Sequence, residues 1–207
     1  MTNNTDLANH ALGLVGVAGI TAITDQNSQA ARTCLLFADQ ARQETLRMGR
    51  WNCATKRANL VEINTAPVAG YTHQFRLPTD FLRLLEVNGE AVKASDEYFE
   101  IEGTALLTDS ETVWIRYIRD IGIGACDVLL QAAIAAKLAQ KIAIPLTAKI
   151  DLSDGMENLF QRKLAEAASI DAKETASADN PNWEKVLDRS RLGRVRGHVR
   201  NPLRIEG

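Results

Sequence analysis

The segment RMGRWNCATKRANLVEI, residues 47–63, places a tryptophan and a cysteine among four cationic side chains and a glycine. A cysteine beside Arg and Lys has the chemistry of an activated thiolate, and a tryptophan beside cations can stack on a nucleic-acid base. However, no histidine stands near Cys53 in the sequence to serve as its base, and Trp51 is isolated in a chain with 5% aromatic residues. We therefore interpret the segment as a junction: a helix ends at Gly49 in a left-handed cap, and Trp51 anchors the following strand.

The sequence also does not match other known motifs for catalysis or ligand binding. The glycines at 13, 16 and 19 lack the tight G-x-G of a dinucleotide loop and the lysine of a phosphate loop. Three histidines lie in separate segments, none at metal-ligand spacing: His10, His73 and His198. The sequence thus predicts no catalytic, cofactor-binding or metal-binding residues, and a protein that is not an enzyme.

The composition and the apolar segments narrow the class of protein further. The chain has 207 residues, 45% of them hydrophobic and 24% charged, which is typical of a globular domain. Its cysteines, Cys34, Cys53 and Cys126, are an odd and widely spaced set, which favours a reducing compartment over a disulfide framework. The apolar run 12–23 has no preceding positive charge, so a signal peptide is not predicted. Polar residues interrupt the longest apolar run, 128–144, which argues against a membrane span.

Periodicity predicts two helices before residue 50. The first begins at a cap at Asn4 or Thr5 and ends at glycines. The second runs from a cap at Asp25 or Ser28 to Gly49. Its predicted buried face has five members: Ala30, Cys34, Phe37, Ala41 and Met48.

Two more helices are predicted near the end of the globular part. Asp127 can cap residues 128–144, which Pro145 is expected to stop. This helix is apolar nearly all round, so it should be buried, either in its own domain or against another subunit. A longer helix follows from about residue 147 to 175, although Gly155 weakens the pattern.

The pattern of residues 53–119 predicts short strands bounded by turn residues, and Asn88-Gly89 indicates a hairpin. We therefore predict an α+β fold: a bundle of about four helices, residues 5–50 and 127–175, with an inserted antiparallel β lobe. These parts would form one core domain, residues 1–176. An extended Arg-rich C-terminal arm, residues 177–207, would follow it.

The arm differs from the body in charge. Residues 184–207 contain seven Lys or Arg and three Asp or Glu, a net charge of +4. Because the whole chain carries −2, residues 1–183 carry −6. Arginine pairs well with carboxylates on a partner. The predicted interface of the arm with a partner comprises Trp183, Arg189, Arg191, Arg194, Arg196, Arg200 and Arg204.

The order of segments carries a resemblance. Residues 8–60 resemble the N-terminal half of the tail adaptor proteins of short-tailed bacteriophages, the tail tubular protein A or gatekeeper family. The matching residues are Asp25, Ala30, Arg42, Trp51, Ala54, Arg57 and Leu60. The segment FRLPTDFLRLLEVNG is similar to a second family segment through Leu77, Pro78, Asp80 and Arg83. Cys53 stands where the family commonly has an aromatic residue, and the arm is not matched.

The resemblance implies a structural virion protein. Such a protein forms a ring, typically of twelve subunits, between the portal protein and the tail nozzle protein, and DNA passes through as cargo. It implies no cofactor, no membrane, and a place in the virion tail after assembly in the bacterial cytoplasm. Gly49, Trp51, Pro78 and Asp80 would be structural junction residues. Two alternatives remain: a nucleic-acid-binding module that acts through the arm, and an enzyme of a reaction that the sequence does not name.

Overall fold

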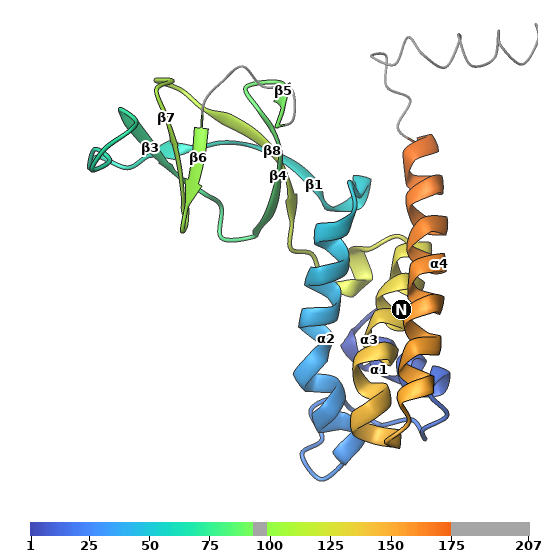
Figure 1. Cartoon of the computed structure of the whole chain (residues 1–207). Helices are drawn as coiled ribbons and strands as arrows, with labels where there is room; N and C mark the ends of the chain where they lie inside the picture. Colours follow the sequence, from blue (N-terminus) through green and yellow to red (C-terminus); the bar gives the residue numbers. More distant parts are fainter. Residues whose placement is uncertain (93–98, 175–207) are drawn as a thin grey trace, which may run out of the picture. The chain divides into compact units, whose positions relative to one another are not determined.

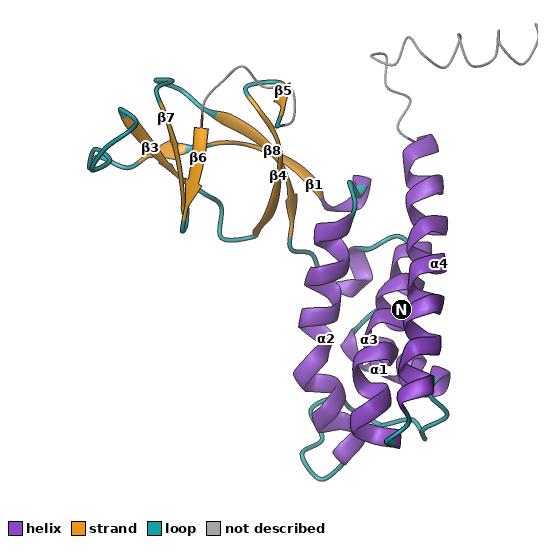
Figure 2. Cartoon of the chain, viewed as in Figure 1, coloured by secondary structure: helices purple, strands orange, loops and turns teal. Residues whose placement is uncertain are grey.

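The computed structural model describes residues 1–92 and 99–174. In this part of the chain, two helices precede a strand-rich region and two follow it: α1 (Asn4–Leu14), α2 (Gln29–Met48), α3 (Val128–Thr147) and α4 (Ile150–Glu174) (Figures 1 and 2). The predicted α+β class is confirmed. The predicted arm, residues 177–207, and the predicted domain boundary at 176 lie outside the described residues.

The four helices share one apolar core. Leu7 of α1, Cys34 of α2, Ile134 of α3 and Ala167 of α4 belong to the same buried cluster, and α3 contacts both α1 and α2. Helices from both ends of the sequence therefore form one bundle, as predicted. Of the two alternatives for the apolar helix, burial within its own domain is the one observed.

Alpha-helix α3 has the length and hydropathy that a membrane-spanning helix would need. Half of its residues are buried, including Leu130, Ile134, Leu138 and Ile142, and they pack against the other helices of the bundle. The core of the bundle thus accounts for its apolar character.

Capping residues fix the starts of three helices. The side chain of Ser28 accepts a hydrogen bond from Ala31 N, and that of Asp127 accepts one from Leu129 N. The cap of the first helix is Asn3, one residue before Asn4 and two before Thr5, and its side chain accepts from Asp6 N at 2.9 Å.

The predicted buried face of α2 is partly wrong. Cys34 and Ala41 are buried, but Met48 is 50% exposed. The buried face instead centres on small residues such as Ala38, and it includes Arg42. The prediction followed the spacing of apolar residues from Ala30 to Met48, whereas the observed face is rotated toward Ala31, Ala38 and Leu46.

The two later helices also run differently from the prediction. Pro145 does not stop α3, which continues to Thr147. Pro145 lies in the last turn, and Ala148, with φ of 56°, closes the helix by donating its N–H to Ile144 O at 2.9 Å. Gly155 does not interrupt α4.

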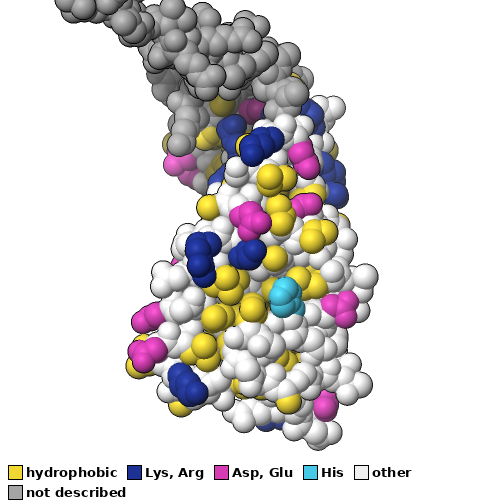
Figure 3. Space-filling model, turned by 90° about the vertical axis from the view of Figure 1, so that its right-hand side faces the viewer, with side chains coloured by type: hydrophobic (Ala, Val, Ile, Leu, Met, Phe, Trp, Pro, Cys, Tyr) yellow, Lys and Arg dark blue, Asp and Glu magenta, His cyan; other side chains and the backbone are white. Residues whose placement is uncertain are grey.

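The last helix of the bundle, α4, is held by a narrow seam. Its fully buried residues are Ser153, Phe160 and Ala167, which are spaced by seven as in a coiled-coil stripe. Ile150 and Ile170 are 67% and 40% exposed. Seen from the side of α4, apolar side chains gather on the helices among charges of both signs (Figure 3).

The strands form two antiparallel four-stranded sheets, in the orders β1-β8-β4-β5 and β2-β3-β7-β6. The strands are β1 (Thr55–Asn59), β2 (Val61–Glu62), β3 (His73–Arg76), β4 (Phe81–Val87), β5 (Glu90–Ala91), β6 (Phe99–Glu102), β7 (Ala105–Thr108) and β8 (Trp114–Arg119). The predicted hairpin is confirmed: β4 pairs with β5 across Asn88 and Gly89, whose φ angles are 50° and 96°.

A second core fills the strand-rich region. It contains Phe75, Leu77, Val87, Leu106, Val113, Ile115 and Tyr117. Along β8 the side chains alternate, so Tyr117 belongs to this core while Ile118 belongs to the core of the bundle. Strand β8 therefore joins the two cores directly.

Candidate functional site

Trp51 is buried at the point where the chain leaves α2 for the first sheet. Its side chain is 2% exposed, and its indole Nε1 donates a hydrogen bond to Thr45 O at 3.2 Å. The ring therefore packs back onto the last turns of α2. The structure places it in the core of the bundle, with its polar atom satisfied.

Gly49 serves a different purpose from the predicted one. Its φ is −113°, so the backbone is extended and the left-handed cap is wrong. A Cβ at this position would lie 2.3 Å from Cε2 of Trp51. Glycine is required here because the indole ring approaches the backbone closely.

We expect Gly49→Ala to destabilise the protein by about 1–3 kcal/mol, because the ring that must move is itself buried. Gly155→Ala is the matched control: nothing lies within 4 Å of a Cβ there, and alanine favours a helix by about 0.5–1 kcal/mol. Urea denaturation of both variants measures the difference. Equal stability of the two variants would contradict this role of Gly49.

Two arginines tie the end of α2 to the start of β4. Arg83 of β4 donates to Arg47 O at 2.7 Å and to Gly49 O at 2.8 Å, and Arg47 donates to Leu82 O. An arginine from the sheet thus satisfies carbonyls that the helix end leaves free. Burial, and then the nearby Arg50 and Arg47, lower the pKa of Arg83.

A second set of bonds fastens the return of the chain from β8 to α3. Arg42, 9% exposed, donates to Asp120, to Ile121 O at 2.6 Å and to Asp39 at 3.0 Å. Gln43 Nε2 donates to the other carboxylate oxygen of Asp120 at 2.8 Å. Sequence reasoning missed Asp120, because nothing in its neighbourhood indicates a partner on a helix 78 residues earlier.

Asp80 connects the start of β4 to both neighbours. Its carboxylate accepts from Tyr117 Oη at 2.8 Å and lies 3.5 Å from Lys56 Nζ. Its carbonyl accepts from Asp120 N at 2.7 Å, so Asp80 adjoins the residue that pairs with Arg42. Burial, and then the bond to Asp80, raise the pKa of Tyr117.

Pro78 lies in the turn before β4, where its carbonyl accepts from Phe81 N at 3.0 Å. It also borders an open cleft of about 450 Å³, together with Arg76, Leu77 and Thr104. Pro78 therefore shapes the sheet side of the junction.

The three cysteines are free thiols. Burial raises the pKa of Cys34 to about 11 and that of Cys126 to about 12, and it also raises the pKa of Cys53. All three are therefore protonated at neutral pH, the opposite of an activated thiolate. Among residues 1–92 and 99–174, no three His, Cys, Asp or Glu side chains are placed to hold a metal ion.

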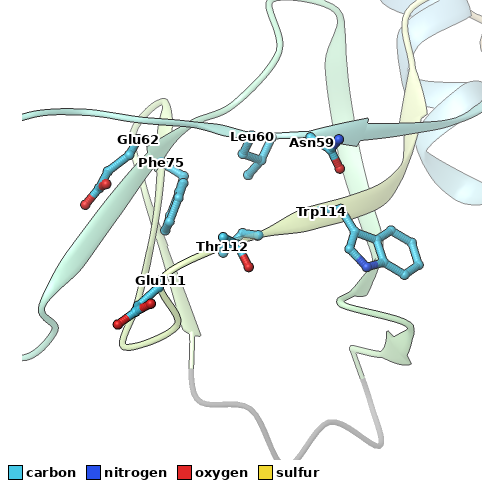
Figure 4. Close-up of a pocket in the computed structure, with 8 residues that line it drawn as sticks. Asn59, Leu60, Glu62, Phe75, Glu111, Thr112 and Trp114 are labelled. Carbon is cyan, nitrogen blue, oxygen red and sulfur yellow. The ribbon is translucent and has the colours of Figure 1, made fainter.

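A second cleft, of about 420 Å³, lies where the chain passes from β1 to β2 (Figure 4). It is lined by Asn59, Leu60, Glu62, Phe75, Glu111, Thr112, Val113 and Trp114. The carboxylates of Glu62 and Glu111 lie toward one end, and the indole of Trp114 lies at the other (Figure 4). The sequence did not indicate this cleft, because its lining comes from β1, β2, β3 and β8.

The predicted arm interface lies outside the described residues: Trp183, Arg189, Arg191, Arg194, Arg196, Arg200 and Arg204. Neither the known family models nor the curated proteins contain a match to this chain.

Proposed function

We propose that this protein is a ring-forming adaptor of a short-tailed bacteriophage, a structural virion protein that joins the portal protein to the tail nozzle protein. Its ring would surround the path of DNA ejection. The observation that carries the proposal is that five of the eleven residues behind the resemblance lie at or beside one junction. Arg42, Trp51, Ala54 and Arg83 lie where α2 meets the strands, and Asp80 joins the strand residues next to them.

The burial and the hydrogen bonds of these residues support the proposal. Ala54 is fully buried beside Trp51, and Arg83 closes the end of α2. Arg42 and Asp80 meet at Asp120, the first through its guanidinium and the second through its carbonyl. A resemblance of scattered residues by chance would give no reason for them to share one structural task.

A ring needs two unlike faces on each subunit, because head-to-tail contacts are heterologous. The surface of α4 beside its buried seam is a candidate for one of them. Ile150 and Ile170 are exposed on opposite flanks of this narrow seam, because twenty residues turn a helix by about 200°. Figure 3 shows apolar side chains on this side of the bundle, which a neighbouring subunit could cover.

The solution mass of the protein, alone and mixed with a portal protein, tests the proposal. We expect a ring of about twelve subunits, or assembly that depends on the portal. Native mass spectrometry resolves both outcomes. A protein that remains a monomer at high concentration and ignores the portal would contradict the proposal.

The arm would supply the grip on the portal or on a neighbouring subunit, since its arginines suit carboxylates on a partner surface. A chain ending at residue 176 retains all of the described bonds of the bundle and the sheets. We expect it to keep its melting temperature and to lose portal binding. Normal sedimentation of the truncated protein with assembled particles would contradict this role of the arm.

The second candidate is a nucleic-acid-binding module, which the cluster of arginines after residue 188 favours. In that case the isolated protein would bind DNA, with an affinity that falls steeply as salt rises. Fluorescence anisotropy of labelled DNA at several salt concentrations distinguishes it from the adaptor. DNA binding without portal binding would favour this candidate.

A further inference from the structure

The cleft between the two sheets offers two separate contacts for guanidinium groups, one at each end. Carboxylates of Glu62 and Glu111 lie toward one end, the indole of Trp114 lies at the other, and Leu60 and Phe75 lie between them (Figure 4). Carboxylates accept paired N–H bonds from arginine, and an aromatic face attracts its planar cation. Lysine would fit less well, because it cannot stack or form a fork.

The carboxylates are free to accept. Glu111 is exposed, and within residues 1–92 and 99–174 no side chain pairs with it. Glu62 uses one oxygen on Nδ1 of His73, at 2.6 Å, and 48% of its side chain is exposed. Its second oxygen remains available to a partner.

The walls of the cleft are fixed before any partner arrives. Leu60 N donates to Val113 O at 2.8 Å, which ties the β1–β2 crossing to the segment before β8. The turn before Glu111 is held by Asp109, whose carboxylate accepts from Thr72 N at 3.0 Å. A preformed cleft loses little entropy when it binds.

We propose that this cleft binds arginines from residues 184–207 of a second copy of the chain. That segment carries a net +4 against −6 for the rest, so its charge complements the acidic end of the cleft. Each copy has one such cleft and one such segment. When each copy passes its segment to the next, the contact is head-to-tail, the type that closes into a ring, and in this respect the inference rests on the proposed adaptor function.

A labelled peptide of residues 184–207 added to the full-length protein tests the site. Fluorescence anisotropy should show saturable binding that weakens as salt rises. Glu62→Gln and Glu111→Gln should each weaken it about three- to tenfold. Glu102→Gln, which removes an exposed charge on β6 outside the cleft lining, is the matched control and should change nothing. No binding, or equal loss in all three variants, would overturn the proposal.

A photo-crosslinker at Thr112, on the cleft wall, identifies which copy supplies the segment. Full-length protein carrying it is mixed with an isotopically labelled chain, and crosslinked peptides are read by mass spectrometry. Crosslinks from residues 184–207 of the other copy support the proposal, while crosslinks confined to one copy overturn it.

Portal-dependent assembly without peptide binding would reject the cleft and keep the adaptor. Peptide binding without assembly would reject the adaptor and keep the cleft.

Discussion

Replacing Trp51 by alanine is expected to cost about 3–5 kcal/mol of unfolding free energy, the usual range for removing a large buried aromatic. The ring is 2% exposed, contacts the core of the bundle and satisfies its own N–H on Thr45 O. Its removal would leave a cavity at the one place where α2, the first sheet and Gly49 meet. Urea denaturation monitored by circular dichroism measures the loss.

Trp114→Ala is the matched control for this experiment, because that indole is partly exposed on a cleft. It should cost less than half as much as Trp51→Ala. If Trp51→Ala instead left the melting temperature unchanged while portal binding fell, Trp51 would be a binding residue and our structural assignment would be wrong.

Arg42→Met is expected to cost about 1–3 kcal/mol, because it leaves the partly buried carboxylate of Asp120 and the carbonyl of Ile121 without their arginine donor. The guanidinium of Arg42 serves Asp120, the carbonyl of Ile121 and Asp39 together. Methionine keeps most of the volume, so the loss reports on the bonds and not on packing.

A double-mutant cycle with Asp120→Asn isolates the pair. The second substitution should cost much less when Arg42 is already methionine, since the carboxylate then has no buried cation to satisfy. Lys163→Met, which breaks an exposed pair with Glu166, serves as the surface control and should cost less than about 1 kcal/mol. Additive losses at Arg42 and Asp120 would show that the pair is not coupled.

The local features of this fold could be predicted from the sequence. Ser28 and Asp127 cap their helices, and Asn88-Gly89 turns a hairpin, because each effect depends on a few adjacent residues. Pro145 was misread for a related reason: its cost depends on its distance from the end of the helix, and that end is set by Ala148.

The bonds of the junction could not be predicted in the same way. Arg42 meets Asp120 across 78 residues, and Asp171 of α4 accepts from Asn52 N across 119. Gly49 looked like a helix cap because glycine commonly ends helices, whereas its neighbour Trp51 determines its role. Long-range pairs such as these depend on how the elements pack, which no short window of sequence contains.

The chain passes between bundle and sheets twice, after Gly49 and after Arg119, and an arginine fastens each passage. Arg83 reaches from the sheet to α2, and Arg42 reaches from α2 to the strand that returns. A force that pulls on the sheets is thus divided between two covalent routes and two sets of bonds. Because both sets of bonds carry the load, we expect the connection between bundle and sheets to resist twisting.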